Sequence, residues 1–219
     1  MGQMRAQGEV GGDGWPGPKL GESAKMRAMG SEIAYFATGC FWGAERRFWQ
    51  MPGVTETSVG YMGGKRPDPS YEQVCTGVTG HAEAVKVVFD PTLVDYETLL
   101  AEFWMMHDPT SLNRQGNDIG TQYRSAIFVT SERQMEMALA SKAKYQSALD
   151  SEGIGEIVTE ISDAREHPYW PAEEYHQKYL KKNPNGYDCH SSTGVTYPLE
   201  NSKQETSHQE SSKQEVSNR

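Results

Sequence analysis

Residues 32–51 read EIAYFATGCFWGAERRFWQM, and this stretch indicates how the chain folds. Its first part, residues 32–38, has the aromatic and β-branched composition of a strand and stops at Gly39. From Cys40 to Met51 the apolar residues recur at helical spacing until Pro52 and Gly53 end the pattern. The sequence therefore predicts a strand, a tight turn and a helix, with Cys40 at the turn.

Strand and helix patterns alternate downstream of this unit. Strands are predicted at 54–61, 82–89 and 125–130, and a helix with one apolar face follows a cap at Asp95. The order β-α-β-β-α-β is typical of a ferredoxin-like core, so we expect an α+β fold, a two-layer sandwich of one sheet and two helices. A long helix after Ser131, a strand at 156–161 and a last helix at about 171–182 should elaborate this core.

The two ends of the chain differ in composition from the middle. Residues 1–31 have no sustained apolar period, and residues 200–219 repeat SKQET, SHQES and SKQEV. Such segments cannot bury an apolar face, so we expect a flexible leader at 1–31 and a disordered low-complexity tail at 200–219. The catalytic or binding domain is predicted at residues 32–199.

Charge and hydropathy exclude several classes of protein. The 219 residues contain 21 Lys and Arg against 30 Asp and Glu, a net charge of −9, which is unlike a nucleic-acid-binding protein. No apolar run reaches the roughly 18 residues of a membrane span, and the leader lacks the apolar core of a secretory signal. We therefore expect a cytoplasmic protein without nucleic-acid or membrane partners. Targeting of the leader to an organelle is left open.

Cys40 is the first candidate for chemistry. Its predicted position at a helix N-terminus favours the thiolate, which is the nucleophilic form of cysteine. The alternative is a buried, inert cysteine. Successive helical residues are rotated by about 100°, so if Phe41 faces the core, Trp42 lies beside the Cys40 sulfur. That indole would make an apolar pocket for a methyl or methylene group, although plain core packing explains the two aromatic residues equally well.

Glu83 is the second candidate. In the strand at 82–89 it shares a face with Val85, Val87 and Phe89, so its carboxyl is expected to be desolvated and protonated near neutral pH. The alternative is a frayed strand end, since Gly80 lies just before it. Three further polar residues are weaker candidates, two of them in a long polar loop at 108–124: Tyr71, Asp118 and Tyr123.

The other cysteines and the histidines are assigned by their surroundings. Cys189 lies in a segment rich in Gly, Asn and Asp, so it can approach and resolve an oxidised Cys40, or it can be an exposed thiol without a role. Cys75 is predicted to be a small core residue. Three scattered cysteines suit neither a disulfide scaffold nor a four-cysteine zinc site. The histidines have no metal-like spacing, so no metal is expected.

Together these motifs resemble the peptide methionine sulfoxide reductase family of the A type. The resemblance covers about residues 33–198. The matching motifs, in family order, are GCFWGAE at 39–45, GYMGG at 60–64, TGHAEAV at 79–85, FDP at 89–91, QGNDIGTQYRSAI at 115–127 and KNPNGY at 182–187.

The resemblance implies reduction of the S epimer of methionine sulfoxide, either free or in proteins, and hence repair of oxidised proteins. Cys40 would attack the sulfoxide sulfur and become a sulfenic acid. Glu83, with Tyr71 and Tyr123 as hydrogen-bond donors, would bind the oxygen and supply the proton.

Four residues would form the substrate site by the same resemblance. Phe41 and Trp42 would enclose the ε-methyl group, and Asp118 and Gly39 would complete the substrate-binding residues. The expected enzyme is a monomer that acts on oxidised proteins and peptides.

The resemblance also implies that the Cys40 thiol is regenerated without a bound cofactor. Cys189 would form a disulfide with Cys40, which thioredoxin would reduce. Many family members read Gly-Tyr-Cys with another cysteine later, whereas here Asp188 separates Tyr187 from Cys189 and no cysteine follows. Direct reduction of the sulfenic acid by thioredoxin or glutaredoxin therefore stays open.

Two other functions are compatible with the sequence. In a Cys-His acyl-transfer enzyme, Cys40 would be the nucleophile and His81 or His107 the base, with no need for Cys189. A non-catalytic ferredoxin-like interaction module would be indifferent to loss of Cys40.

Overall fold

The computed structural model describes residues 30–188 and 191–199. The predicted leader, except for its last two residues, the predicted tail and Cys189 lie outside the described residues. The strands are β1 (Glu32–Thr38), β2 (Val54–Met62), β3 (Ala82–Phe89), β4 (Arg114–Gln115), β5 (Asp118–Ile119), β6 (Ser125–Val129), β7 (Glu160–Asp163) and β8 (Trp170–Pro171). The helices are α2 (Phe41–Trp49), α3 (Tyr71–Cys75), α4 (Tyr96–Met106), the 3₁₀ turn η1 (Thr121–Tyr123), α5 (Glu132–Ser151) and α6 (Tyr179–Lys182).

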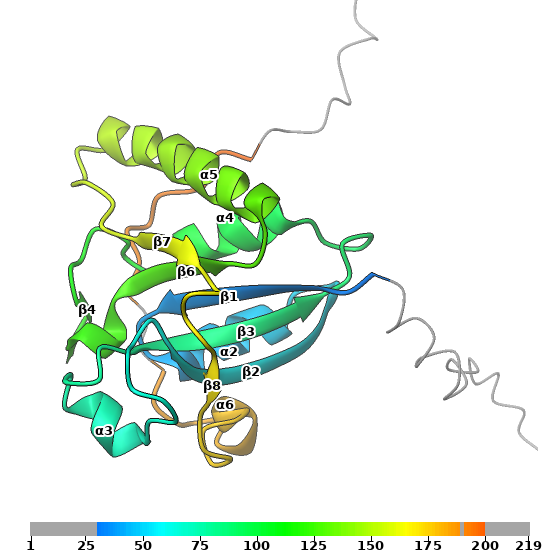
Figure 1. Cartoon of the computed structure of the whole chain (residues 1–219). Coiled ribbons are helices and arrows are strands. Elements are labelled where there is room, and N and C mark those ends of the chain that lie inside the picture. The colour runs from blue at the N-terminus through cyan, green and yellow to red at the C-terminus, as the bar shows by residue number, and fades with distance from the viewer. Residues whose placement is uncertain (1–29, 189–190, 200–219) are drawn as a thin grey trace, which may run out of the picture. The chain divides into compact units, whose positions relative to one another are not determined.

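The main sheet has the strand order β7-β6-β1-β3-β2-β8 (Figure 1). β3 lies between β1 and β2 and is antiparallel to both, and β6 is antiparallel to β1 on the other side. These four strands have the order of a ferredoxin-like sheet, to which β7 adds in parallel and β8 adds in antiparallel orientation. The predicted α+β fold with a β-α-β-β-α-β core is confirmed.

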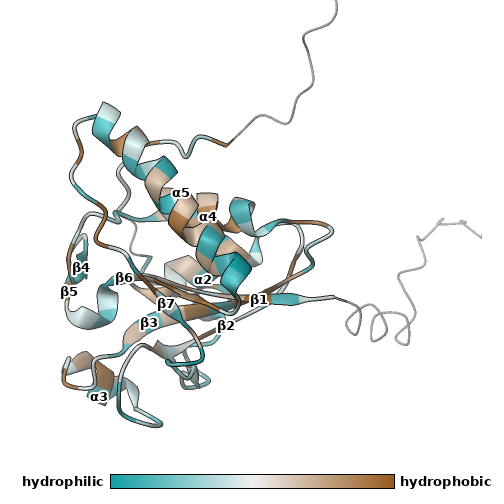
Figure 2. Ribbon diagram, turned by 45° about the horizontal axis from the view of Figure 1, so that its top comes forward, coloured by the Kyte–Doolittle hydropathy of each residue, from teal (hydrophilic) through white to brown (hydrophobic). Residues whose placement is uncertain are grey.

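The apolar core lies between one face of this sheet and the helices. Phe36 of β1 stacks on Phe48 of α2 and contacts Phe103 of α4, and all three rings are fully buried. α5 packs against α4 through the same core, with Tyr145 stacked on Trp104. Figure 2 shows apolar colour in β3 and α4, and a mixture of apolar and polar turns in α5. The sheet and helices thus form the predicted layers.

The helix starts follow the caps expected from the sequence. The Asp95 side chain accepts a hydrogen bond from the Thr98 N–H at 2.7 Å, and that of Ser131 accepts from the Gln134 N–H at 3.2 Å. No helix in the described part of the chain is both long and apolar enough to cross a membrane.

Two predictions for the C-terminal region are wrong. The helix predicted at 171–182 is reduced to α6, because Pro171 pairs with Gly60 as β8 and the following residues form turns. Gln177 bonds the N–H and C=O of Val59 at 2.9 and 2.8 Å and so replaces a strand neighbour. Lys178 then takes a left-handed conformation with φ of 51°. The strand predicted at 156–161 forms four residues later, as β7.

Candidate active site

Cys40 occupies the N-cap position of α2, directly after β1. Gly39 before it has φ of +101°, and a Cβ on Gly39 would lie 2.7 Å from the Gln115 side chain, so only glycine fits the turn. Cys40 is 8% exposed, which places its thiol at the mouth of the buried core. The N-terminus of α2 carries the positive end of the helix dipole, which favours a negative charge on the sulfur at this position.

Glu83 lies on the apolar face of β3, as the strand alternation predicts, and it is 2% exposed. Its Oε2 accepts a hydrogen bond of 3.0 Å from the backbone N–H of Phe41, the residue after Cys40. The pKa of Glu83 is raised to about 8, mainly by burial; the hydrogen bond from Phe41 acts to lower it and the charge of Asp118 acts to raise it. Glu83 is therefore mainly protonated at pH 7.

The Phe41 bond also indicates which oxygen of Glu83 carries the proton. The carbonyl oxygen of a neutral acid is a stronger acceptor than its hydroxyl oxygen, so we assign Oε2 as the carbonyl oxygen. The proton is then on Oε1, which has no N–H of Phe41 bound to it. A neutral carboxylic acid is thus available as a donor beside the thiol.

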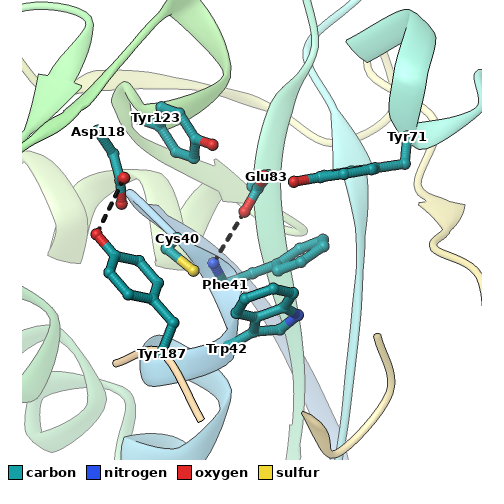
Figure 3. Close-up of a pocket in the computed structure, with 8 residues that line it drawn as sticks. All are labelled: Cys40, Phe41, Trp42, Tyr71, Glu83, Asp118, Tyr123 and Tyr187. Carbon is teal, nitrogen blue, oxygen red and sulfur yellow. Dashed lines mark hydrogen bonds between the residues drawn. The ribbon is translucent and has the colours of Figure 1, made fainter. Parts of the chain in front are cut away.

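Two tyrosine hydroxyls flank this carboxyl in Figure 3. Tyr71 comes from α3, which begins with a capping box at Ser70, and Tyr123 comes from η1. Burial is the largest cause that raises the pKa of each phenol above its usual range, and the nearby Glu83 charge raises both further. Both hydroxyls therefore remain protonated donors at neutral pH.

These groups line one cavity of about 140 Å³. Its volume is close to the roughly 150 Å³ of an engineered cavity that accepts benzene, so it suits a small group and not a large ligand. The lining residues are Cys40, Phe41, Trp42, Tyr71, Glu83, Asp118, Tyr123 and Tyr187 (Figure 3). Phe41 is buried and Trp42 is partly exposed, as the helix rotation predicts, and both still reach the cavity. The cavity therefore combines an apolar aromatic wall with acid donors.

Tyr187 is the lining residue that was not predicted from the sequence. Its hydroxyl donates to Asp118 Oδ1 at 3.1 Å. The other oxygen, Oδ2, is buried and has no hydrogen-bond partner within the described residues, so it is available to a polar group of a ligand. Asp188, the next residue, pairs with Arg46 of α2. The available signal was the position of Tyr187 at the end of the KNPNGY motif, just before Asp188 and Cys189.

Other sequence predictions have different outcomes. Gly39 shapes the turn but is not a lining residue within the described chain. Cys75 is exposed, so the prediction of a core cysteine is wrong. α3 is a single short helix at the surface, and Val74 provides its buried contact instead.

The histidine bases of the acyl-transfer alternative lie elsewhere. His107 is buried with its two ring nitrogens bonded to the Phe103 carbonyl and the Ser125 hydroxyl, both at 2.7 Å. Burial lowers the pKa of His81 and of His107 to about 4. Neither ring lines the cavity, so the described residues offer Cys40 no histidine base there. No three potential metal-ligating side chains gather within the described residues.

Comparisons with known proteins identify the family of the chain. The family model described as peptide methionine sulfoxide reductase matches residues 32–212. The chain is 58% identical over 170 residues to peptide methionine sulfoxide reductase MsrA of Streptomyces griseus, covering 78% of this chain and 77% of that one. MsrA 1 of Synechocystis is 57% identical over 171 residues, covering 78% and 76%.

Solved structures are similar as well. Methionine sulfoxide reductase A of Corynebacterium diphtheriae has a TM-score of 0.67 at 45% identity, covering 78% of this chain and 84% of that one. Reduced Mxr1 of Saccharomyces cerevisiae has a TM-score of 0.68 at 34% identity, covering 74% and 92%. From the family match, these identities and the shared fold, it follows that the chain belongs to the peptide methionine sulfoxide reductase family.

Proposed function

We propose that this chain reduces methionine sulfoxide, free and in peptides and proteins, with Cys40 as the nucleophile and Glu83 as the acid. The observation that carries the proposal is the Glu83 carboxyl, buried, protonated and bonded to the residue after Cys40. A sulfoxide needs a thiolate for its sulfur and a proton donor for its oxygen, and both groups line one small cavity.

The reaction balances without a bound cofactor. The Cys40 thiolate bonds to the sulfoxide sulfur while the proton of Glu83 passes to the oxygen, with Tyr71 and Tyr123 donating to that oxygen. The S–O bond and the bond between the two sulfurs then break as the hydroxyl moves to the Cys40 sulfur. Methionine leaves and Cys40 becomes a sulfenic acid, so the substrate gains the two electrons that the cysteine loses.

The same geometry favours one epimer, which is the S epimer if the chain follows the family that it resembles. The oxygen binds the donors on the Glu83 side of the cavity, and the methyl group contacts Phe41 and Trp42. The third substituent must point outward, where Asp118 can accept a hydrogen bond from the substrate through Oδ2. A pyramidal sulfur satisfies all three directions in one hand only.

Cys189 resolves the sulfenic acid in this proposal. The two residues before it are held near the site, Tyr187 by Asp118 and Asp188 by Arg46 of α2, the helix that begins beside Cys40. Attack of the Cys189 thiol on Cys40 releases water and forms a disulfide, which a dithiol such as thioredoxin reduces. A monomer suffices for this reaction, since all these groups come from one chain, and we propose a cytoplasmic location.

The test mixes reduced protein with each epimer of a blocked methionine sulfoxide, without added reductant. The expected result is one methionine per chain from the S epimer and a Cys40–Cys189 linked peptide, detected by intact mass and peptide mapping. Cys40→Ser should release none, and absence of release from the unchanged protein would overturn the proposal.

Two cysteine variants test recycling separately. Cys189→Ser should still release one methionine but lose turnover with thioredoxin. Cys75→Ser is the matched control and should keep both, because Cys75 lies on α3 at the surface. Full thioredoxin-dependent turnover by Cys189→Ser would overturn the role of Cys189 and favour direct reduction of the sulfenic acid by thioredoxin.

A further inference from the structure

One buried amide lies against the turn that presents Cys40, and the reaction described above does not use it. Gln115, in β4, is 2% exposed and is not among the described residues that line the cavity. Its methylene carbons pack on Gly39, since a Cβ built on that glycine would lie 2.7 Å from Cγ and 2.8 Å from Cβ of Gln115. Gln115 therefore supports the turn from outside the cavity.

The amide end of this side chain bonds both backbone groups of one residue. Gln115 Oε1 accepts from the Asp108 N–H at 3.0 Å, and Nε2 donates to the Asp108 C=O at 2.7 Å. Asp108 directly follows His107, the C-cap residue of α4. Two bonds to one residue allow the amide a single orientation, because each bond needs its own donor and acceptor direction. Gln115 is thereby anchored to the end of α4.

A tight hairpin connects this anchor to the cavity. Gln115 of β4 pairs directly with Asp118 of β5, and Gly116 in the turn between them has φ of 53°. A turn of two residues fixes the register of a hairpin, and side chains directly opposite each other lie on one face with Cβ atoms roughly 4.5–5.5 Å apart. The place of Gln115 therefore determines the place of the Asp118 carboxylate, which lines the cavity (Figure 3).

The second lining residue of this loop, Tyr123, is held by a different contact. Arg124 Nε donates to Glu160 Oε2 of β7 at 3.0 Å, and its Nη1 donates to the Thr121 C=O at 3.0 Å. These bonds fix η1 without the help of Gln115. A change at Gln115 should therefore displace Asp118 more than Tyr123.

We propose that Gln115 is a positioning residue that holds the Asp118 carboxylate against the substrate and so sets substrate affinity. This inference rests on the proposed function, in which Asp118 accepts a hydrogen bond from the substrate. Without the amide, the two backbone groups of Asp108 lose these partners and turn toward water, so the hairpin shifts away from the cavity. Cys40 and Glu83 stay in place at the start of α2 and on β3.

The main test is Gln115→Met. Methionine keeps the Cβ and Cγ atoms that pack on Gly39 and removes both amide bonds. We expect KM for a blocked methionine sulfoxide to rise about tenfold, with the maximal single-turnover rate within about twofold of the parental rate. The rate at which iodoacetamide alkylates Cys40 should also be parental, because the packing on the turn remains.

Gln134→Met is the matched control. Gln134 is also 2% exposed, accepts from the Thr130 N–H at 3.0 Å and donates to the Ile33 C=O at 2.9 Å. These bonds lie at the opposite end of β1 from Cys40. Both variants should lower the midpoint of urea unfolding, but only Gln115→Met should raise KM. The control thus separates positioning from a general loss of stability.

Two further variants connect the effect to Asp118. In an Asp118→Ala background, Gln115→Met should leave KM within about twofold, because the group that it displaces has been removed. Gln115→Asn keeps a buried amide that is one methylene shorter, so its KM should exceed the parental value by less than that of Gln115→Met. If Gln115→Met does not fold, a parental KM in Gln115→Asn overturns the inference.

The outcomes distinguish the inference from the function that it rests on. A parental KM in Gln115→Met, or an equal rise in Gln134→Met, overturns the role of Gln115 and leaves the reductase standing. A tenfold rise that persists in the Asp118→Ala background overturns it too, since Gln115 would then act through another group. Failure of the unaltered enzyme to release methionine overturns the function itself.

Discussion

The two sides of the cavity are positioned by different means. Cys40 and Glu83 lie on a β-strand-to-helix turn and a central strand, where backbone hydrogen bonds determine their places. The aromatic wall is supported by the C-terminal segment, residues 170–188, which contains only β8 and the short α6. This segment is held in place by individual side chains that bond to groups far away in the sequence. Secondary structure thus positions the reacting groups, and buried polar pairs position the wall.

The largest expected effect is a loss of activity on the reactive side of the cavity, the side of Cys40 and Glu83. Glu83→Ala removes the donor and should slow single-turnover methionine release by roughly 10²–10⁴-fold, whereas Glu83→Gln should retain part of the rate because an amide still donates to oxygen. The folded pKa of about 8 means that the protonated acid is lost as pH rises through 8. The unmodified enzyme should therefore slow above that pH in rapid-quench measurements.

Equal losses in Glu83→Ala and Glu83→Gln would mean that proton transfer, and not hydrogen bonding, accounts for the whole effect. A rate that rises through pH 8 would contradict the assignment of Glu83 as the acid. The stability of both variants should stay close to that of the parent, which circular dichroism can check.

In the C-terminal segment, substitutions should lower the stability of the protein more than its rate of methionine release. Lys178 Nζ donates to Glu45 Oε1 at 2.8 Å, and Glu45 is fully buried. Lys178→Met leaves that carboxylate without its cation and should reduce the free energy of unfolding by about 3–5 kcal/mol. Urea unfolding gives the measurement. Lys182→Met is the control, since its exposed pair with Glu174 should contribute less than about 1 kcal/mol. Similar losses of unfolding free energy in Lys178→Met and Lys182→Met would contradict the special role of the buried pair.

A smaller effect is expected at Gln177. Gln177→Ala exposes no charge but leaves the N–H and C=O of Val59 in β2 without their side-chain partner, which should cost about 1–3 kcal/mol. Gln177→Glu keeps the acceptor for the Val59 N–H but places a carboxylate oxygen against the carbonyl oxygens of Val59 and Ala172, so its midpoint of urea unfolding should lie no higher than that of Gln177→Ala at neutral pH. If Gln177→Ala unfolds at the parental midpoint, the segment is not held by this residue.

The smallest effect on the free energy of unfolding is expected at a helix cap outside the C-terminal segment. Asp95→Ala removes the bond to the Thr98 N–H at the start of α4 and should cost about 1 kcal/mol. Methionine release should be unchanged, because α4 contributes no residue to the cavity lining. If Asp95→Ala lowered the free energy of urea unfolding more than Lys178→Met, the helix cap would stabilise the fold more than the buried pair of the C-terminal segment, contrary to this prediction.

The reactive side was predictable because its signals are local. Alternation in β3 predicted Glu83 on the apolar face, with a frayed strand end as the alternative, and Gly39 marked the turn before Cys40. The same reasoning predicted the order of strands and helices.

The C-terminal segment was not predictable from local patterns. Residues 171–182 have helical spacing, but pairing of Pro171 with Gly60 and the bonds of Gln177 override it. His176 and Tyr187 contact groups far away in the chain, and such side-chain bonds have no period. Cys75 was misplaced for a related reason, since a five-residue helix at the surface carries too little pattern to show which side is buried.

The sequence separations across the cavity also have a consequence for folding. Phe41 bonds Glu83 over 42 positions, Trp42 bonds His176 over 134, and Arg46 bonds Asp188 over 142. Contacts of such high order close large loops and form late, after local helices and hairpins. During synthesis, Cys40 therefore leaves the ribosome long before the residues that direct it toward a sulfoxide. The nascent chain carries an accessible thiol but acquires its selectivity only when residues 170–188 have docked.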